Sequence, residues 1–186
     1  MDAARLVFSE RGYDGATFQA IAVRADLTRP AINHYFPSKR ALYREVVDQT
    51  NELVVAAGIE RAYRETTLMG RLGSFIAAAL RANSDSPSAS AFLVTNVLES
   101  QRHPELNKAE NDSVRISREF LTWAVNDAIE RGEIAADIDV SALTETLLVV
   151  LCGVGFYAGY LRSREMEGVT EMLRQLLTGA LWRPKT

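Results

Sequence analysis

The sequence has 186 residues, of which 47% are hydrophobic and 24% charged, and its formal net charge is −3. These proportions are those of an ordinary globular chain and exclude a disordered, fibrous or collagen-like protein. A single cysteine, Cys152, excludes a disulfide framework and paired metal-binding thiols, so we expect no metal, no cofactor and a cytoplasmic location.

Helix signals dominate the first third of the chain. Residues 2–11 form a helical segment that ends at Gly12, and residues 18–25 form a second one, capped by Thr17. Thr28 caps a third, short helix that ends before Pro37. Ser38 then begins a much longer helix, which runs to about residue 64.

The rest of the chain continues the same pattern, with apolar residues at helical spacing and turn residues between the segments. We expect further helices at about 67–83, 89–101, 107–131, 141–163 and 167–181. About nine helices with short connections predict an all-α protein.

Residues 17–36 have the spacing of a helix-turn-helix unit, two short helices joined by a turn. Ile32 is the inward residue of the second helix and should pack on Ile21, Ala22 and Leu27. Arg29 and Asn33 then lie on the outer face, one turn apart. Their donors suit guanine and adenine edges in a DNA major groove.

Charge is distributed unevenly along the sequence. Residues 1–50 hold seven Lys and Arg against six Asp and Glu (7 − 6 = +1), whereas residues 51–186 hold fourteen against eighteen (14 − 18 = −4). Within residues 24–44, five basic side chains face one acidic residue, Asp26. A basic region on an acidic body favours a nucleic-acid-binding head, although a solvated charged surface would give the same pattern.

The segment TFQAIAVRADLTRPAINHYFPSKRALY resembles the DNA-binding region of the tetracycline-repressor (TetR) family. The resemblance covers residues 3–48. It departs from the family pattern at Asp26, which replaces a turn glycine, at Asn33, which replaces a tyrosine, and at Tyr35, which replaces a histidine. The sequence begins inside the family's first helix, so we expect a basic N-terminal arm to be missing from it.

This resemblance implies a DNA-binding domain at residues 1–45 and an effector-binding and dimerisation domain at residues 46–186. Thr17, Thr28, Tyr35 and Lys39 are candidates for phosphate contacts, since helix N-termini bind anions. The whole set of predicted DNA-binding residues is Thr17, Gln19, Thr28, Arg29, Pro30, Ala31, Asn33, His34, Tyr35 and Lys39.

The apolar run LLVVLCGVGFYAGYL at residues 147–161 has three interpretations. As a membrane span it is too short, so we expect no membrane partner. Gly153-Val154-Gly155 begins a dinucleotide-type G-x-G-x-x-A pattern, which would suit a nicotinamide-dependent enzyme, but bulky Phe156 and Tyr157 oppose a bound pyrophosphate. The third interpretation is a buried helix that also packs on a second copy of the chain. It predicts a dimer interface of Leu151, Gly155, Gly159, Met172 and Leu176.

Aromatic and polar residues of the body are candidates for an effector pocket, although a plain aromatic core is an alternative. The predicted pocket residues are Phe75, Phe92, Asn96, His103, Phe120, Trp123, Asn126, Phe156 and Tyr157. With so few polar groups, such a pocket would take a mostly apolar molecule.

These observations together predict a homodimeric, ligand-responsive DNA-binding regulator. We expect a repressor that a small-molecule effector releases from a palindromic, double-stranded DNA operator. No catalytic constellation occurs in the sequence, so we expect no enzyme activity. The alternative is a helical protein-binding adaptor with a vestigial head.

Overall fold

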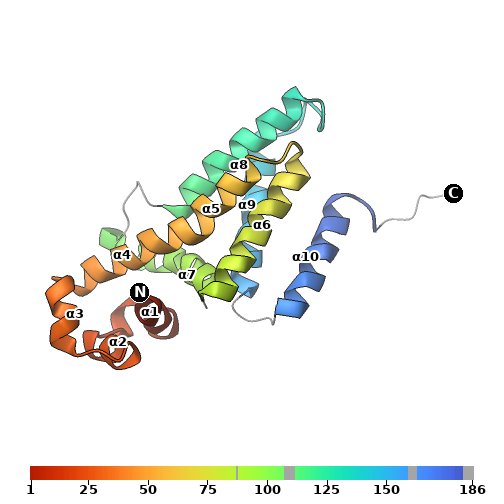
Figure 1. Cartoon of the computed structure of the whole chain (residues 1–186). Helices are drawn as coiled ribbons and strands as arrows, with labels where there is room; N and C mark the ends of the chain where they lie inside the picture. Colours follow the sequence, from red (N-terminus) through yellow and green to blue (C-terminus); the bar gives the residue numbers. More distant parts are fainter. Residues whose placement is uncertain (87, 107–111, 159–162, 182–186) are drawn as a thin grey trace.

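A computed structural model describes residues 1–86, 88–106, 112–158 and 163–181, and every regular element within these ranges is helical (Figure 1). Helices α1 (Asp2–Gly15), α2 (Phe18–Arg24) and α3 (Arg29–Tyr35) form a head at one end of the molecule. The all-α prediction, with a helix-turn-helix head on a helical body, is confirmed.

Side-chain caps begin the short helices of the head where the sequence predicts them. The Thr17 hydroxyl accepts a hydrogen bond from the Ala20 amide at 3.1 Å, and the Thr28 hydroxyl accepts one from the Ala31 amide at 3.3 Å. Each bond satisfies a first-turn amide that has no partner within the helix, and this fixes where α2 and α3 start.

Two residues with positive φ shape the turns of the head. Gly12 has φ 67° inside α1, so the first helical run ends there as predicted, and a short turn follows it. Asp26 has φ 53° in the turn between α2 and α3, a conformation that favours glycine but that Asp tolerates. Ile32 is buried against Ile21 as expected. The expected packing of Leu27 is wrong: its side chain is 55% exposed.

One continuous helix leads from the head into the body. It comprises α4 (Lys39–Asn51), the π-helical segment η1 (Glu52–Ala56) and α5 (Ala57–Ala62). Ser38 caps it through a 3.1 Å bond from the Ala41 amide. Its length agrees with the predicted helix, but the π-helical segment was not foreseen. Such segments are rare and occur frequently at functional sites.

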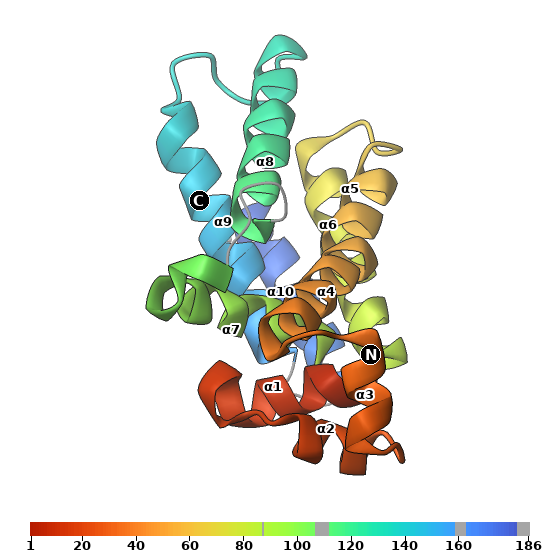
Figure 2. The same ribbon diagram turned by 90° about the vertical axis from the view of Figure 1, so that its left-hand side faces the viewer.

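The body consists of α6 (Leu68–Asp85), α7 (Ala89–Arg102), a 3₁₀ turn η2 (Pro104–Leu106), α8 (Ser113–Glu130), α9 (Val140–Tyr157) and α10 (Ser163–Leu177). Helices α5 and α6 pack together, as do α8 and α9, and α7 crosses between the head and the body (Figure 2). Helix α10 lies beside α6. The start of the predicted 107–131 helix falls at 107–111, outside the described residues.

The apolar run at residues 147–161 is helical through Tyr157, so the described part of its glycine pattern does not follow a strand. This geometry contradicts the dinucleotide-binding interpretation, which needs a strand, a tight turn and then a helix. Among the described residues, α9 is the one helix long and apolar enough to cross a membrane by length and composition, and 28% of it is buried within the chain. This test applies to the whole of α9, which begins before the apolar run, and it leaves the prediction about the shorter run at residues 147–161 unchanged.

Tyr43 of α4 lies at the junction of the head and the body. Its hydroxyl donates a 2.8 Å hydrogen bond to the Asn96 Oδ1 atom on α7, and its side chain is 1% exposed. Its ring contacts Phe8 of α1 edge-on, with 4.9 Å between centroids, and lies 5.7 Å from the ring of Phe92. Three helices therefore meet on one side chain.

Tyr43→Phe should lower the free energy of unfolding by about 1–3 kcal/mol, because the Asn96 oxygen would remain buried without its donor. Urea denaturation followed by circular dichroism measures this change. Tyr63→Phe is the control, since Tyr63 is 56% exposed and should lose much less stability. Equal losses in the two variants would contradict a special role for the Tyr43 hydroxyl.

The same tyrosine predicts a dependence of stability on alkaline pH. Burial, the largest cause, and nearby Glu99 raise the pKa of Tyr43 above its usual value. Its contribution to folding is therefore fully present below the unfolded-state pKa of about 10 and is lost as the pH rises toward the folded-state value. Denaturation midpoints measured from neutral to alkaline pH should fall less steeply for Tyr43→Phe than for the wild type.

Candidate nucleic-acid interface and internal cavity

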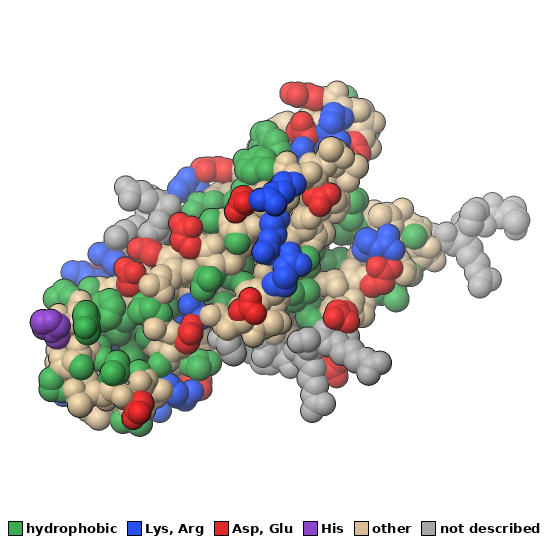
Figure 3. Space-filling model, viewed as in Figure 1, with side chains coloured by type: hydrophobic (Ala, Val, Ile, Leu, Met, Phe, Trp, Pro, Cys, Tyr) green, Lys and Arg blue, Asp and Glu red, His purple; other side chains and the backbone are tan. Residues whose placement is uncertain are grey.

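Helix α3 presents nearly all of its side chains to solvent. Arg29, Pro30, Asn33, His34 and Tyr35 are exposed and Ala31 is half-buried, whereas Ile32 alone is buried and holds the helix on the head. Arg29 and Asn33 are four residues apart and therefore share one face. Figure 3 shows this end of the molecule as a surface rich in hydrophobic groups, with a histidine at its tip.

Further predicted contact residues flank this helix. Thr17 and Gln19 are exposed at the start of α2, and Thr28 is exposed at the start of α3. The hydroxyls of the two threonines already accept bonds from their own helices, so each helix start is fixed and its remaining first-turn amides face outward. Such amides are suited to bind phosphate oxygens.

Three of the five basic side chains in residues 24–44 bind groups within the protein itself. Lys39 Nζ donates to the Tyr13 and Asp14 carbonyls at 2.8 and 3.2 Å and lies 4.5 Å from the Tyr13 ring centroid. Arg24 forms a two-point ion pair with Glu10, at 2.7 and 3.0 Å. Arg44 donates to the Glu105 carbonyl.

Residues 24–44 therefore leave fewer basic side chains available to a partner than their composition indicates. Arg29, at the start of α3, and Arg40, in the first turn of α4, are exposed and make no ion pair or side-chain hydrogen bond with the described residues. Lys39 has a structural position instead, because it closes the C-terminal end of α1. Its predicted role in phosphate binding would require these carbonyl bonds to be shared or broken.

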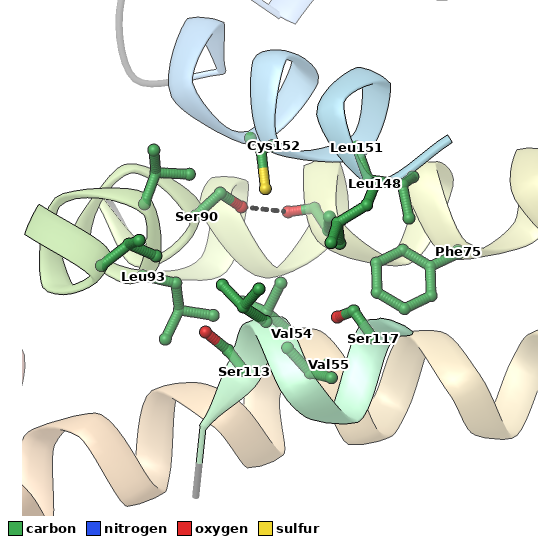
Figure 4. A pocket seen from close by; sticks show the side chains of 15 residues that line it. Val54, Val55, Phe75, Ser90, Leu93, Ser113, Ser117, Leu148, Leu151 and Cys152 are labelled. Carbon is green, nitrogen blue, oxygen red and sulfur yellow. Dashed lines mark hydrogen bonds between the residues drawn. The ribbon is translucent and has the colours of Figure 1, made fainter. Parts of the chain in front are cut away.

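The body contains a partly open cavity with a free volume of about 70 Å³ between η1, α6, α7, α8 and α9 (Figure 4). Its lining is almost wholly apolar and includes no charged side chain among the described residues. The lining residues are Val54, Val55, Phe75, Ala79, Ser90, Leu93, Val94, Val97, Ser113, Val114, Ser117, Leu148, Leu151, Cys152 and Gly155.

The few polar groups of the cavity differ in their bonding. Ser90 donates a 3.1 Å hydrogen bond to the Ala79 carbonyl, the dashed line in Figure 4. Ser113 and Ser117 point into the cavity from α8. Burial raises the pKa of the Cys152 thiol, so the thiol stays protonated at neutral pH. The cavity is thus a neutral, apolar environment.

Comparison with known proteins identifies the head. Residues 1–46 match the family described as bacterial regulatory proteins, tetR family. The HTH-type transcriptional regulator UidR of Escherichia coli strain K12 is 25% identical over 155 residues, which cover 83% of this chain and 76% of UidR. Residues 1–46 therefore form a DNA-binding head of the tetR-family type. The resemblance to the TetR family that was found in the sequence is confirmed.

Solved structures extend the likeness to the whole chain. PfmR from Thermus thermophilus, a TetR-family regulator, superposes with a TM-score of 0.72 at 23% identity and covers 98% of each chain. AibR, solved in complex with isovaleryl coenzyme A and operator DNA, has a TM-score of 0.64 at 17% identity, covering 92% of this chain and 94% of AibR. These two likenesses establish the shared fold of head and body.

The structure does not bring the predicted pocket residues together in one cavity. Phe75 alone lines the cavity, and Phe120 stacks behind it at 6.0 Å between centroids. Phe92 and Asn96 belong to the Tyr43 junction. His103 also lies between head and body, 3.2 Å from the Asp14 carboxylate.

The remaining pocket candidates lie on the outside of the body. Trp123 is 38% exposed beneath the Arg71 guanidinium, at 4.3 Å from the ring centroid, and Asn126 is exposed and donates to the Thr122 carbonyl. Phe156 and Tyr157 contact each other on the outer side of α9. Aromatic character alone selected these residues, whereas the observed cavity is lined mostly by aliphatic side chains.

The predicted dimer-interface residues divide between two sides of α9 and α10. Leu151 and Gly155 face the cavity, since a Cβ atom on Gly155 would lie 3.4 Å from Val94. Met172 and Leu176 on α10 are 48% and 47% exposed. Gly159 lies outside the described residues.

Proposed function

We propose that this chain is a transcriptional repressor that binds a palindromic operator as a homodimer and is released from it by a small, mostly apolar effector. The observation that carries the DNA-binding part is the exposed face of α3, where Arg29 and Asn33 lie one turn apart on a helix anchored by Ile32. An arginine and an asparagine in this position can donate to guanine and adenine edges. A cytoplasmic location follows from this role.

The two proposed domains meet within the long helix. Residues 1–45 contain α1–α3 and the start of α4, and residues 46–186 contain the rest of that helix and the body. The Tyr43 junction lies next to this boundary and fixes α4 to α7. Phe8 of α1 packs on the same Tyr43 ring, so a tilt of α4 would carry α1 of the head with it.

Helices α9 and α10 support a homodimer through an apolar groove between them. Its described lining is apolar throughout and consists of Val150, Gly153, Val154, Tyr157, Met166, Val169, Met172, Leu173 and Leu176. Val149, next to the groove, is 70% exposed. A continuous apolar surface of this kind marks an interaction site. A second copy, adding its own α9 and α10, would complete a four-helix interface and pair two recognition helices.

Gly153→Arg should give a folded monomer that no longer binds a palindrome tightly. A Cβ atom at Gly153 would meet no atom within 4 Å, so the new side chain starts in open space and places a charge in the proposed interface. Size-exclusion chromatography with light scattering measures the mass. Ala136→Arg, in the exposed loop before α9, is the matched control and should remain dimeric. A dimeric Gly153→Arg protein would show that the interface lies elsewhere.

Selection of the wild-type protein on random DNA duplexes should return a palindrome, and Arg29→Ala should relax the preference at one base pair in each half-site. The loss of affinity for the best site should be about 1–3 kcal/mol. Arg40→Ala should instead weaken all sequences alike and reduce the salt slope by about one unit. No enrichment from the random pool would favour the protein-binding adaptor, and equal losses on every sequence would contradict the role of Arg29.

The cavity and η1 connect a bound effector to the operator-binding head. Val54 and Val55, in the π-helical segment of the long helix, line the cavity and are 5% and 4% exposed. A cavity of about 70 Å³ is much smaller than the roughly 300–1,000 Å³ of common ligand sites. An effector must therefore separate the surrounding helices, and the movement of η1 would tilt α4.

An effector that lowers operator affinity 100-fold requires about 2.7 kcal/mol of preference for the tilted state. Neutral apolar molecules screened for release of a fluorescent operator duplex should include such a compound, and the operator should weaken its binding by the same factor. Val97→Phe, which fills the cavity, should bind the operator but lose the response. Trp123→Ala, outside the cavity, should keep it. An effector that binds equally with and without operator would contradict this coupling.

A further inference from the structure

Two serine side chains on α8 face the apolar cavity and form no hydrogen bond with another described residue. Ser113 is 8% exposed and Ser117 is 7% exposed, and neither side chain has a hydrogen bond to another described group. Both line the cavity and point into it (Figure 4). Neither oxygen is among the fully buried, unpaired side-chain atoms of the described residues, so both hydroxyls are open to the cavity and available to a molecule within it.

The spacing of these serines places their donors together. Residues 113 and 117 are four apart in α8 and therefore lie on the same face, one turn from each other. Ser90 provides the contrast within the same cavity, because its hydroxyl already donates to the Ala79 carbonyl at 3.1 Å. The unused hydrogen-bonding capacity of the described lining is thus concentrated on one wall, that of α8.

The surroundings restrict what could accept these hydrogen bonds. Val54, Leu93 and Leu148 are among the aliphatic residues of the lining, and the described lining carries no charged group. A carboxylate or phosphate would lose its hydration there without gaining a cation, which is strongly unfavourable. A carbonyl oxygen has two lone pairs and no charge, and it can accept from both hydroxyls.

We propose that Ser113 and Ser117 bind the carbonyl oxygen of the effector, and that the effector is a neutral ketone, ester or lactone on a compact hydrocarbon frame. This assignment rests on the proposed function, since it names the chemical class of the molecule that the cavity takes. The serines act as specificity-determining residues. The aliphatic lining supplies affinity, and the two donors select the carbonyl compound over a hydrocarbon of the same shape.

Cyclohexanone and methylenecyclohexane test this proposal because they differ mainly in an oxygen replaced by a CH₂ group. Binding can be followed on the intact protein through protection of Cys152, the single cysteine, from alkylation by iodoacetamide at alkaline pH, where its thiolate forms, since Cys152 lines the same cavity. The wild-type protein should bind the ketone about tenfold more tightly than the alkene, which corresponds to about 1.4 kcal/mol. Cyclohexanecarboxylate should give no protection.

The variant Ser113→Ala/Ser117→Ala should bind the ketone and the alkene with equal affinity, and its affinity for the alkene should not fall. Ser90→Ala is the matched control: it removes a hydroxyl from the same lining, but one already bonded to the protein, so the tenfold preference should persist. A purely structural role of the serines would change stability and leave the preference intact. Thermal denaturation checks that both variants are folded.

The outcomes separate this proposal from the proposed function. If both probes protect Cys152 equally in the wild-type protein, or if the double variant keeps the preference, the serine assignment is wrong while the cavity remains a ligand site. If neither probe protects Cys152 up to its solubility limit, the carbonyl assignment fails together with the proposed role of this cavity. Equal protection by the carboxylate would contradict the neutral class of ligand.

Discussion

The hydrogen bond between the Tyr43 hydroxyl and Asn96 joins the two functional parts of the molecule. The bond is buried, and Phe8 and Phe92 enclose it from α1 and α7. A buried polar pair is stabilising only while both members stay together, because separating them leaves two unsatisfied groups. The head is therefore not a freely jointed unit. Its position is coupled to α7, whose other side lines the cavity through Ser90 and Leu93.

The head uses its charges in two ways, which composition does not distinguish. Lys39 and Arg24 bind groups within the head, and so they fix α1 against α4 and α2 against α1. Arg29 remains available on the recognition helix. Non-specific attraction to DNA rises with the number of phosphates neutralised, so a head with few available cations depends more on base contacts and on a second copy of itself.

Local rules made the head predictable from the sequence. The caps at Thr17 and Thr28 and the break at Pro37 are set by nearest neighbours, and the structure contains them where they were expected. Packing between distant segments was not predictable in this way. From the sequence, aromatic residues such as Phe92 and Trp123 could line a pocket, pack at a junction between helices or lie on the outer surface. Their actual places depend on how α7 and α8 cross their neighbours. The i,i+4 spacing of Ser113 and Ser117 on an otherwise apolar face was a usable signal for the cavity.

The π-helical segment η1 explains how a small cavity could control a large movement. One extra residue in a helical turn is accommodated there, between the Tyr43 junction and the body. Val54 and Val55 of this irregular turn line the cavity, so the proposed effector would contact the part of the long helix with the least regular hydrogen bonding. A regular helix would resist such a change because each of its amides is bonded four residues back. Binding of the proposed effector in this cavity would therefore act on the irregular segment that joins α4 to α5.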